Sequence, residues 1–111
     1  LPHGKEHILC VDDELELLKV TAEQLESLGY SVTTTASGID AVKMFYQDPD
    51  RFDLVVTDQS MPRMSGLELA GELRQIRPDI TMMLVTGYSE IRPDKKREQD
   101  MFSKILKNMS S

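Results

Sequence analysis

Acidic residues stand at two separate places where a short apolar run of the chain ends. The Asp-Asp-Glu at 12–14 follows such a run near the N-terminus, and Asp58 follows the β-branched run at 54–57. A single aspartate at such a position often does no more than cap a turn or favour the positive N-terminus of a helix. If both runs are strands of one parallel sheet, the acidic residues meet, because groups at the carboxyl ends of such strands gather at one edge.

The chemistry open to such a cluster is that of a metal ion and a phosphoryl group. Three carboxylates in one small pocket repel one another, so they cannot all stay ionised at low cost. A divalent cation relieves this repulsion, and Mg²⁺ prefers oxygen ligands such as carboxylates, carbonyls and water. With the cation bound, one carboxylate can attack phosphorus and form an acyl phosphate. Such a transfer needs mainly in-line positioning and neutralised charge.

A hydroxyl and a lysine farther along the chain fit the same chemistry. Thr86 follows a third apolar run, at 80–85, and its hydroxyl can donate a hydrogen bond to a phosphoryl oxygen. The plain alternative for Thr86 is ordinary turn chemistry before Gly87. A lysine from the last apolar run, at 101–106, would complete the charge compensation.

The elements that must position these residues alternate between strands and helices. Strands are predicted at 7–11, 31–35, 53–57 and 80–85, with a weaker fifth at 101–106. Helices are predicted at 14–28, from Ser37 to the Asp-Pro-Asp at 48–50, from Ser65 to the Arg-Pro-Asp at 77–79, and in a short polar stretch around 90–99. This alternation predicts an α/β fold with a parallel sheet and right-handed crossovers.

The predicted helices have recognisable ends and one apolar face each. Gly29 is a natural C-terminal stop for the first helix, and Ser37 fits as the N-cap of the second. Ser65 with Glu68 three positions later forms a capping-box pattern at the start of the third. The buried faces, with apolar residues at three- and four-residue steps, are predicted to be Leu18, Ala22, Leu25 and Leu28; Ile39, Val42 and Phe45 or Tyr46; and Leu69, Leu73 and Ile76.

Composition and charge narrow the class of protein. A chain of 111 residues is enough for one domain with one core. The net charge of −6 argues against a nucleic-acid or anionic-membrane surface, since both need a basic face. Cys10 lies in an apolar run and is expected to be buried rather than reactive. No apolar run approaches the roughly 20 residues that span a bilayer, and residues 1–5 lack the apolar region of a signal peptide, so we expect a cytoplasmic domain without membrane contact.

Three stretches of the chain resemble the response regulator receiver domain of two-component signalling. They read ILCVDDE at 8–14, VVTDQSMPRMSG at 55–66 and LVTGYSE at 84–90, in the order of the family and each at a strand end. The likeness covers about residues 6 to 107. It implies a flavodoxin-like fold with strand order 2-1-3-4-5, in which residues 1–6 are a linker and 7–111 are the receiver domain.

The resemblance also implies a role for each residue of the cluster. Asp58 would accept a phosphoryl group from a phosphohistidine of a sensor histidine kinase or a histidine phosphotransfer domain. Asp13 and Asp58 would bind Mg²⁺ directly, with the backbone carbonyl of Ser60 as a third protein ligand and Asp12 acting through water. Thr86 would be the switch hydroxyl. The domain would thus be a signalling phosphoacceptor and not an enzyme.

The sequence flanking the motifs resembles that of receivers in one particular domain arrangement. Residues 1–7, 50–53 and 86–90 look like those of receivers fused to the C-terminus of hybrid sensor histidine kinases. A free-standing receiver, or one placed ahead of an output domain, is the alternative.

The last part of the chain departs from the family pattern. The family ends its fifth strand with Lys-Pro, whereas residues 100–108 contain no proline. Lys104 is the favoured phosphoryl partner, Lys107 is the alternative, and both can be plain surface lysines. Phe102 is assigned as the aromatic switch or as core. The chain stops at Ser111, where the fifth helix should begin, so we expect a truncated domain whose uncovered apolar face favours self-association.

Three other functions compete with this interpretation. A Mg²⁺-dependent phosphatase with an aspartyl nucleophile requires a second acidic residue two positions after the nucleophile, where this chain has Ser60. A flavin-binding module of the same fold wants a phosphate cradle after the first strand, where the acids at 12–14 would repel phosphate. A degenerate receiver that serves only for docking is the third, and the weak fifth strand keeps it open.

Overall fold

The computed structural model describes residues 6–85, which form alternating strands and helices around one parallel sheet. In chain order the elements are β1 (His7–Val11), α1 (Leu15–Ser27), β2 (Ser31–Thr35), α2 (Gly38–Gln47), β3 (Leu54–Asp58), α3 (Gly66–Ile76) and β4 (Thr81–Val85). Each lies where the sequence predicts it, with ends that differ by about one residue at most. Within this part of the chain, every helix is too short or too polar to cross a membrane.

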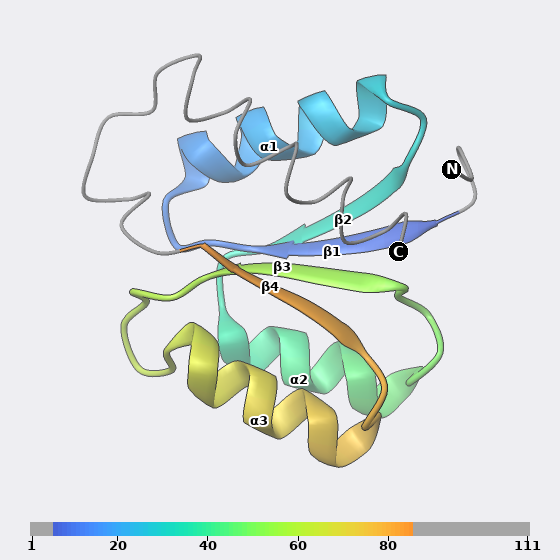
Figure 1. Cartoon of the computed structure of the whole chain (residues 1–111). Coiled ribbons are helices and arrows are strands. Elements are labelled where there is room, and N and C mark those ends of the chain that lie inside the picture. The colour runs from blue at the N-terminus through green and yellow to red at the C-terminus, as the bar shows by residue number, and fades with distance from the viewer. Residues whose placement is uncertain (1–5, 86–111) are drawn as a thin grey trace.

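The four described strands run parallel in the order β2-β1-β3-β4. α1 covers one face of the sheet, and α2 and α3 cover the other (Figure 1). This arrangement confirms the predicted α/β fold and the flavodoxin-like order over its first four strands. The predicted fifth strand, the predicted helix at 90–99 and residues 1–5 of the predicted linker lie outside the described part. The predictions of a truncated end and of self-association likewise concern residues outside it.

Alternation along the strands divides the core between the two faces of the sheet. Ile8 and Cys10 pack on the α1 side, whereas Leu9 and Val11 pack on the side of α2 and α3. All residues of β3 are buried, as expected for a central parallel strand covered on both faces. Cys10 is buried as predicted, and burial is the main reason why the pKa of its thiol rises to about 12. A thiol in that state is inert.

The buried face of α1 is shifted from the predicted one. Leu28 is 43% exposed, because α1 ends before it and the chain turns away through Gly29, whose φ is 100°. The prediction that Leu28 belongs to the core is therefore wrong. The predicted Ala22 is only partly buried, whereas Leu17 and Thr21, which the prediction did not include, are buried. The buried residues of α1 are Leu17, Leu18, Thr21 and Leu25.

The buried face of α2 also differs from the predicted one. Ile39 is 43% exposed and Tyr46 is 70% exposed, so neither belongs to the core. Phe45, the alternative to Tyr46, is fully buried. The sheet-facing stripe runs through Gly38, Ala41 and Phe45, and this stripe places Ile39 and Tyr46 on the outer side of the helix.

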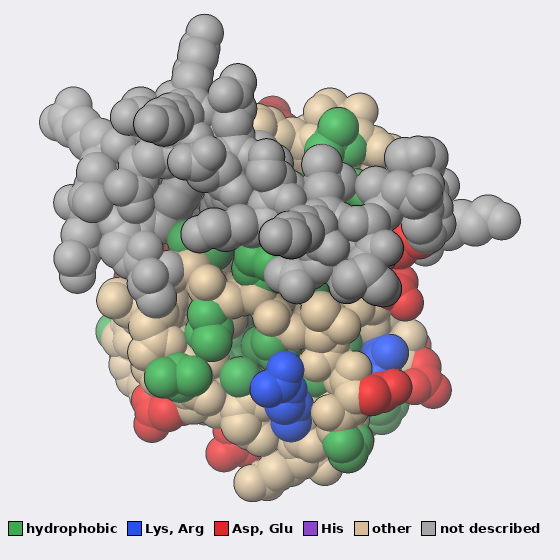
Figure 2. Space-filling view, in the orientation of Figure 1, with side chains coloured by type: hydrophobic (Ala, Val, Ile, Leu, Met, Phe, Trp, Pro, Cys, Tyr) green, Lys and Arg blue, Asp and Glu red, His purple; other side chains and the backbone are tan. Residues whose placement is uncertain are grey.

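The described residues include five large hydrophobic side chains that are exposed. On the face seen in Figure 2, hydrophobic, acidic and basic side chains are interspersed over the layer formed by α2 and α3. Scattered apolar residues of this kind are ordinary for a protein surface. The large exposed ones are Leu15, Leu28, Ile39, Tyr46 and Leu67.

The predicted N-caps of α2 and α3 are confirmed. The Ser37 side chain accepts a hydrogen bond from the backbone N–H of Asp40 at 3.3 Å. At α3, the Ser65 hydroxyl accepts from the N–H of Glu68 at 3.1 Å, and the Glu68 carboxylate accepts from the N–H of Ser65 at 2.9 Å. This reciprocal pair is a capping box, and it fixes the residue at which α3 begins.

The start of α3 lies unusually close to the ends of β3 and β4. A Cβ added at Gly66 would lie 2.6 Å from Cδ2 of Leu84 and 2.7 Å from the carbonyl oxygen of Asp58. Only a glycine allows this approach, because the second contact is with backbone that cannot move aside cheaply. The rest of the inner face of α3 is buried or partly buried as predicted, through Leu69, Leu73 and Ile76.

The same substitution at two glycines of α3 should have opposite effects on stability. We expect Gly66→Ala to lower the free energy of unfolding by about 1–3 kcal/mol, because the new methyl group meets the Asp58 carbonyl. Gly71→Ala should raise it by about 0.5–1 kcal/mol, because nothing lies within 4 Å of its added Cβ and alanine favours helix. Urea denaturation of both variants checks this, and equal effects at the two sites would refute the close approach.

Candidate metal site at the carboxyl edge of the sheet

The register of the central strands brings the two acidic places together. β1 and β3 are paired so that Val11 lies opposite Thr57. Asp12 and Asp58, which follow these two residues, therefore leave the sheet side by side. On its other side, β3 pairs Asp58 with Val85 at the end of β4. The sequence predicted that these ends meet, and the backbone pairing is the reason that they do.

Three aspartates form one compact cluster at this edge. Asp12, Asp13 and Asp58 each offer a carboxylate oxygen, and these oxygens all lie within 4.8 Å of one another. Asp58 is 3% exposed and forms the floor of the cluster, whereas Asp12 is half-buried and Asp13 is exposed. The cluster is therefore open to solvent on the side of Asp13 and closed on the side of Asp58.

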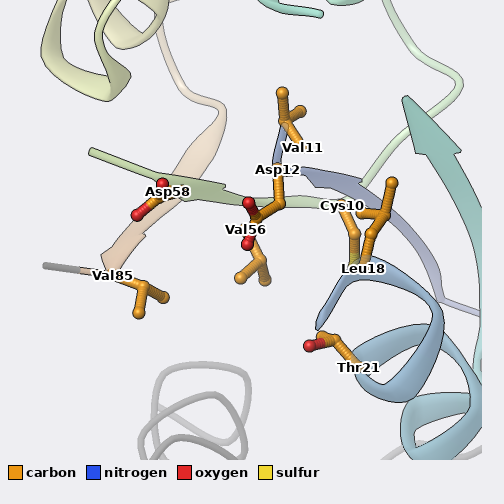
Figure 3. Close-up of a pocket in the computed structure, with 8 residues that line it drawn as sticks. All are labelled: Cys10, Val11, Asp12, Leu18, Thr21, Val56, Asp58 and Val85. Carbon is orange, nitrogen blue, oxygen red and sulfur yellow. The ribbon is translucent and has the colours of Figure 1, made fainter. Parts of the chain in front are cut away.

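A pocket lined in part by Asp12 and Asp58 lies between α1 and the ends of β1, β3 and β4. Figure 3 shows the carboxylates of Asp12 and Asp58 on neighbouring strands at its upper side and the Thr21 hydroxyl of α1 below them. The other lining side chains are apolar. The lining residues are Cys10, Val11, Asp12, Leu18, Thr21, Val56, Asp58 and Val85.

The environment of Asp12 opposes its negative charge. Burial, the largest cause, and the charges of Asp58, Asp13 and Glu14 together raise the pKa of Asp12 to about 6. A hydrogen bond that the Asp12 carboxylate accepts from the backbone N–H of Glu14, at 2.9 Å, acts in the opposite direction. A divalent cation would remove the repulsion. The donor set of carboxylate oxygens at this spacing fits a hard cation such as Mg²⁺.

Asp12 also caps the turn before α1, which is the structural role that a lone acidic residue often has. Its bond to the N–H of Glu14 holds the turn that leads into α1, whose own N-cap residue, Glu14, makes no side-chain capping bond. That role accounts for one carboxylate oxygen of Asp12 and for none of Asp58. Helix capping alone therefore does not explain why a second strand delivers a buried carboxylate to the same place.

Sequence reasoning missed Gln59, which ties three elements together beside the cluster. Its backbone N–H donates to the carbonyl of Val85 at 3.0 Å, and its own carbonyl accepts from the N–H of Gly66 at 3.0 Å. Its side-chain Oε1 accepts from the N–H of Leu67 at 2.8 Å. The only signal in the sequence is a polar residue between the strand end and the Pro-Gly turn. Ser60 follows it and is exposed.

The remaining predicted site residues fall outside the part of the chain that the structure describes. They are Thr86, Lys104, Lys107 and Phe102. The pairing of Asp58 with Val85 places the end of β4 next to the cluster, and Thr86 is the residue that follows in the chain.

Comparison with known sequences identifies relatives of the chain. The family model described as "Response regulator receiver domain" matches residues 8–110. Among curated proteins, the chain is similar to the transcriptional regulatory protein GlrR of Escherichia coli (strain K12). The two are 33% identical over 109 residues, which are 96% of this chain and 24% of GlrR. The chain thus spans about a quarter of the length of that relative.

Solved structures of similar proteins share the fold. The response regulator protein TrrA from Thermotoga maritima, solved in complex with Mg²⁺-BeF, is 40% identical, with 81% of this chain and 76% of that chain covered and a TM-score of 0.69. A chain of the crystal structure of histidine kinase ThkA in complex with TrrA is 33% identical, with 96% and 99% covered and a TM-score of 0.74.

Removing one charge from the cluster should stabilise the metal-free protein. The pKa of Asp12 is about 6 in the folded protein and 3.8 ordinarily, so between these values the folded state binds more protons than the unfolded state. The free energy of unfolding therefore falls as the pH rises through this window, and it stays low above it. At about pH 7.5, in the presence of a chelator, Asp12→Asn should raise the free energy of unfolding by an amount on the order of 1 kcal/mol.

Urea denaturation measures this change, and asparagine keeps an oxygen for the N–H of Glu14. Glu72→Gln, on the exposed side of α3, removes one negative charge elsewhere and serves as the control. An Asp12→Asn protein no more stable than the Glu72→Gln protein would contradict the raised pKa of Asp12 in the folded state.

Proposed function

The chain belongs to the response regulator receiver domain family, and from this premise we propose that Asp58 accepts a phosphoryl group in two-component signal transduction. The observation that carries the proposal is the position of Asp58. Its carboxylate is the buried member of a cluster at the carboxyl edge of a parallel sheet. One carboxylate oxygen each of Asp12, Asp13 and Asp58 lies within 4.8 Å of the other two. Reactive groups of open α/β folds gather at that edge.

The proposed reaction moves a phosphoryl group from nitrogen to oxygen. A carboxylate oxygen of Asp58 attacks the phosphorus of a phosphohistidine, a P–O bond forms, and the P–N bond breaks with its electron pair returning to the imidazole. The product is an acyl phosphate on Asp58. Because Asp58 is only 3% exposed, its carboxylate is held in one place by the end of β3, as in-line attack requires.

A magnesium ion is the proposed cofactor. Asp13, Asp58 and the backbone carbonyl of Ser60 would bind it directly, and Asp12 would bind it through water. When bound, the ion neutralises the carboxylates and the phosphoryl oxygens. Support comes from the oxygen donor set of the three aspartates and from TrrA, a similar protein solved in complex with Mg²⁺-BeF.

The proposed phosphoryl donor is a sensor histidine kinase or a histidine phosphotransfer domain. TrrA, which is similar to this chain, was solved in complex with the histidine kinase ThkA. The sequence flanking the motifs favours a place at the C-terminus of a hybrid kinase, in the cytoplasm. The net charge of −6 favours protein partners over nucleic acid or an anionic membrane.

The proposed output is a change of surface beyond β4. Thr86 and Lys104, or Lys107 in its place, would be drawn to the phosphoryl group, and Phe102 would follow as the aromatic switch. Such a switch is a population shift between two states, of which one binds the phosphoryl group better. The pairing of Asp58 with Val85 supports this route, because it joins the phosphoacceptor to the end of β4.

Substitution of the phosphoacceptor should abolish labelling. With Mg²⁺ and a small phosphodonor such as acetyl phosphate, the wild-type chain should gain one phosphoryl group and the Asp58→Asn chain none, because an amide oxygen does not form the acyl phosphate. Intact-mass spectrometry reads the result directly. Asp50→Asn, an exposed residue before β3 at the opposite edge of the sheet, is the matched control and should label like the wild type. Undiminished labelling of Asp58→Asn would overturn the assignment.

Stabilisation by Mg²⁺ should depend on pH in a direction set by Asp12. As the pH falls through about 6, Asp12 takes up a proton, and the cluster loses a charge that attracts the cation. The rise in melting temperature caused by Mg²⁺ should therefore be several degrees at about pH 8 and much smaller at about pH 5. Differential scanning calorimetry checks this. A rise that is equal at both pH values would contradict the proposed site.

A further inference from the structure

We propose, on the basis of the function proposed above, that the side chain of Gln59 is a positioning group for the metal site. It would act by holding the loop between β3 and α3, which carries the Ser60 carbonyl. Gln59 need not touch the ion or the phosphoryl group itself.

The contacts of Gln59 close this loop at its base. The main-chain bond from Gly66 to the Gln59 carbonyl, at 3.0 Å, joins the two ends of the loop, and the bond from Leu67 to its Oε1, at 2.8 Å, joins them a second time. The Gln59 N–H, bonded to the Val85 carbonyl, anchors the same residue to β4. Three hydrogen bonds of one residue thus join β3, β4 and α3.

The loop itself is compact and has little freedom to compensate for a lost contact. Met64 donates its N–H to the Pro62 carbonyl at 2.8 Å, and Arg63 between them has a φ of 70°, in the left-handed region. At the far end of the loop, a Cβ added at Gly66 would lie 2.7 Å from the carbonyl oxygen of Asp58, so the two backbone segments are in close contact there. A shift at the base of the loop is therefore passed on to Ser60.

The bond to Leu67 satisfies a group that the helix cannot satisfy alone. The first N–H groups of a helix have no partner within it, and the Leu67 N–H belongs to the first turn of α3. Without the Gln59 amide oxygen, this N–H turns to water, and one of the two ties across the loop is lost. Groups that orient a metal ligand in this indirect way commonly change metal affinity by about 10-fold or more when removed.

Two substitutions of Gln59 separate the hydrogen bond from the bulk of the side chain. Gln59→Met keeps the length and removes the acceptor, whereas Gln59→Glu keeps an acceptor for the Leu67 N–H. The control is Ser37→Ala, which removes the N-cap of α2 and so lowers stability on a different loop. Mg²⁺ alone is titrated into each isotope-labelled protein, and its binding is followed by the amide resonances of Asp12, Asp13 and Asp58. Hydrogen exchange of the Leu67 amide proton is measured in parallel.

We expect Gln59→Met to bind Mg²⁺ about 10-fold more weakly than the wild type and to exchange the Leu67 amide proton faster. Gln59→Glu should protect that proton and bind Mg²⁺ at least as tightly as the wild type, and Ser37→Ala should bind it unchanged. Equal Mg²⁺ affinity in Gln59→Met and the wild type would overturn the inference, as would Gln59→Glu binding as weakly as Gln59→Met. A wild-type protein that binds Mg²⁺ but gains no phosphoryl group would refute the proposed function alone, because the Gln59 comparison uses no phosphodonor.

Discussion

Mutual repulsion among three carboxylates, held together by backbone pairing, is the constraint on which the rest of this site depends. The register that sets Val11 opposite Thr57 forces Asp12 and Asp58 to leave the sheet side by side, and Asp13 follows at once. The strands cannot separate these charges without losing the central ladder of the core. The repulsion is therefore built into the fold, and a cation is the natural means of relieving it.

The surrounding elements keep the cluster rigid on one side and open on the other. β3 is buried along its whole length, so Asp58 has little room to move. Gly66 lets the start of α3 approach the Asp58 carbonyl, and Gln59 ties that same start back to β3. Asp13, by contrast, is exposed. This asymmetry suits a carboxylate that must hold its position while a phosphoryl donor approaches from solvent.

The sequence predicted the features that depend on local chemistry, and it failed where packing in three dimensions decides. Acidic residues directly after apolar runs, together with strand–helix alternation, were enough to place the cluster at one edge of the sheet. Ile39 and Tyr46 were misplaced because apolar residues occur on both sides of α2, and only contact with the sheet selects Phe45. Gln59 was missed because its side chain accepts a hydrogen bond from the N–H of Leu67, a contact that no sequence periodicity indicates.

The central claim is that these aspartates form one cation site rather than separate surface charges. Manganese(II), a paramagnetic substitute for magnesium, broadens amide resonances near the place where it binds. At substoichiometric concentration it should broaden Asp12, Asp13 and Asp58 together, while Leu54 at the other end of β3 stays sharp. Broadening that is spread evenly over exposed acids such as Asp50, or that affects Asp13 without Asp58, would contradict the account.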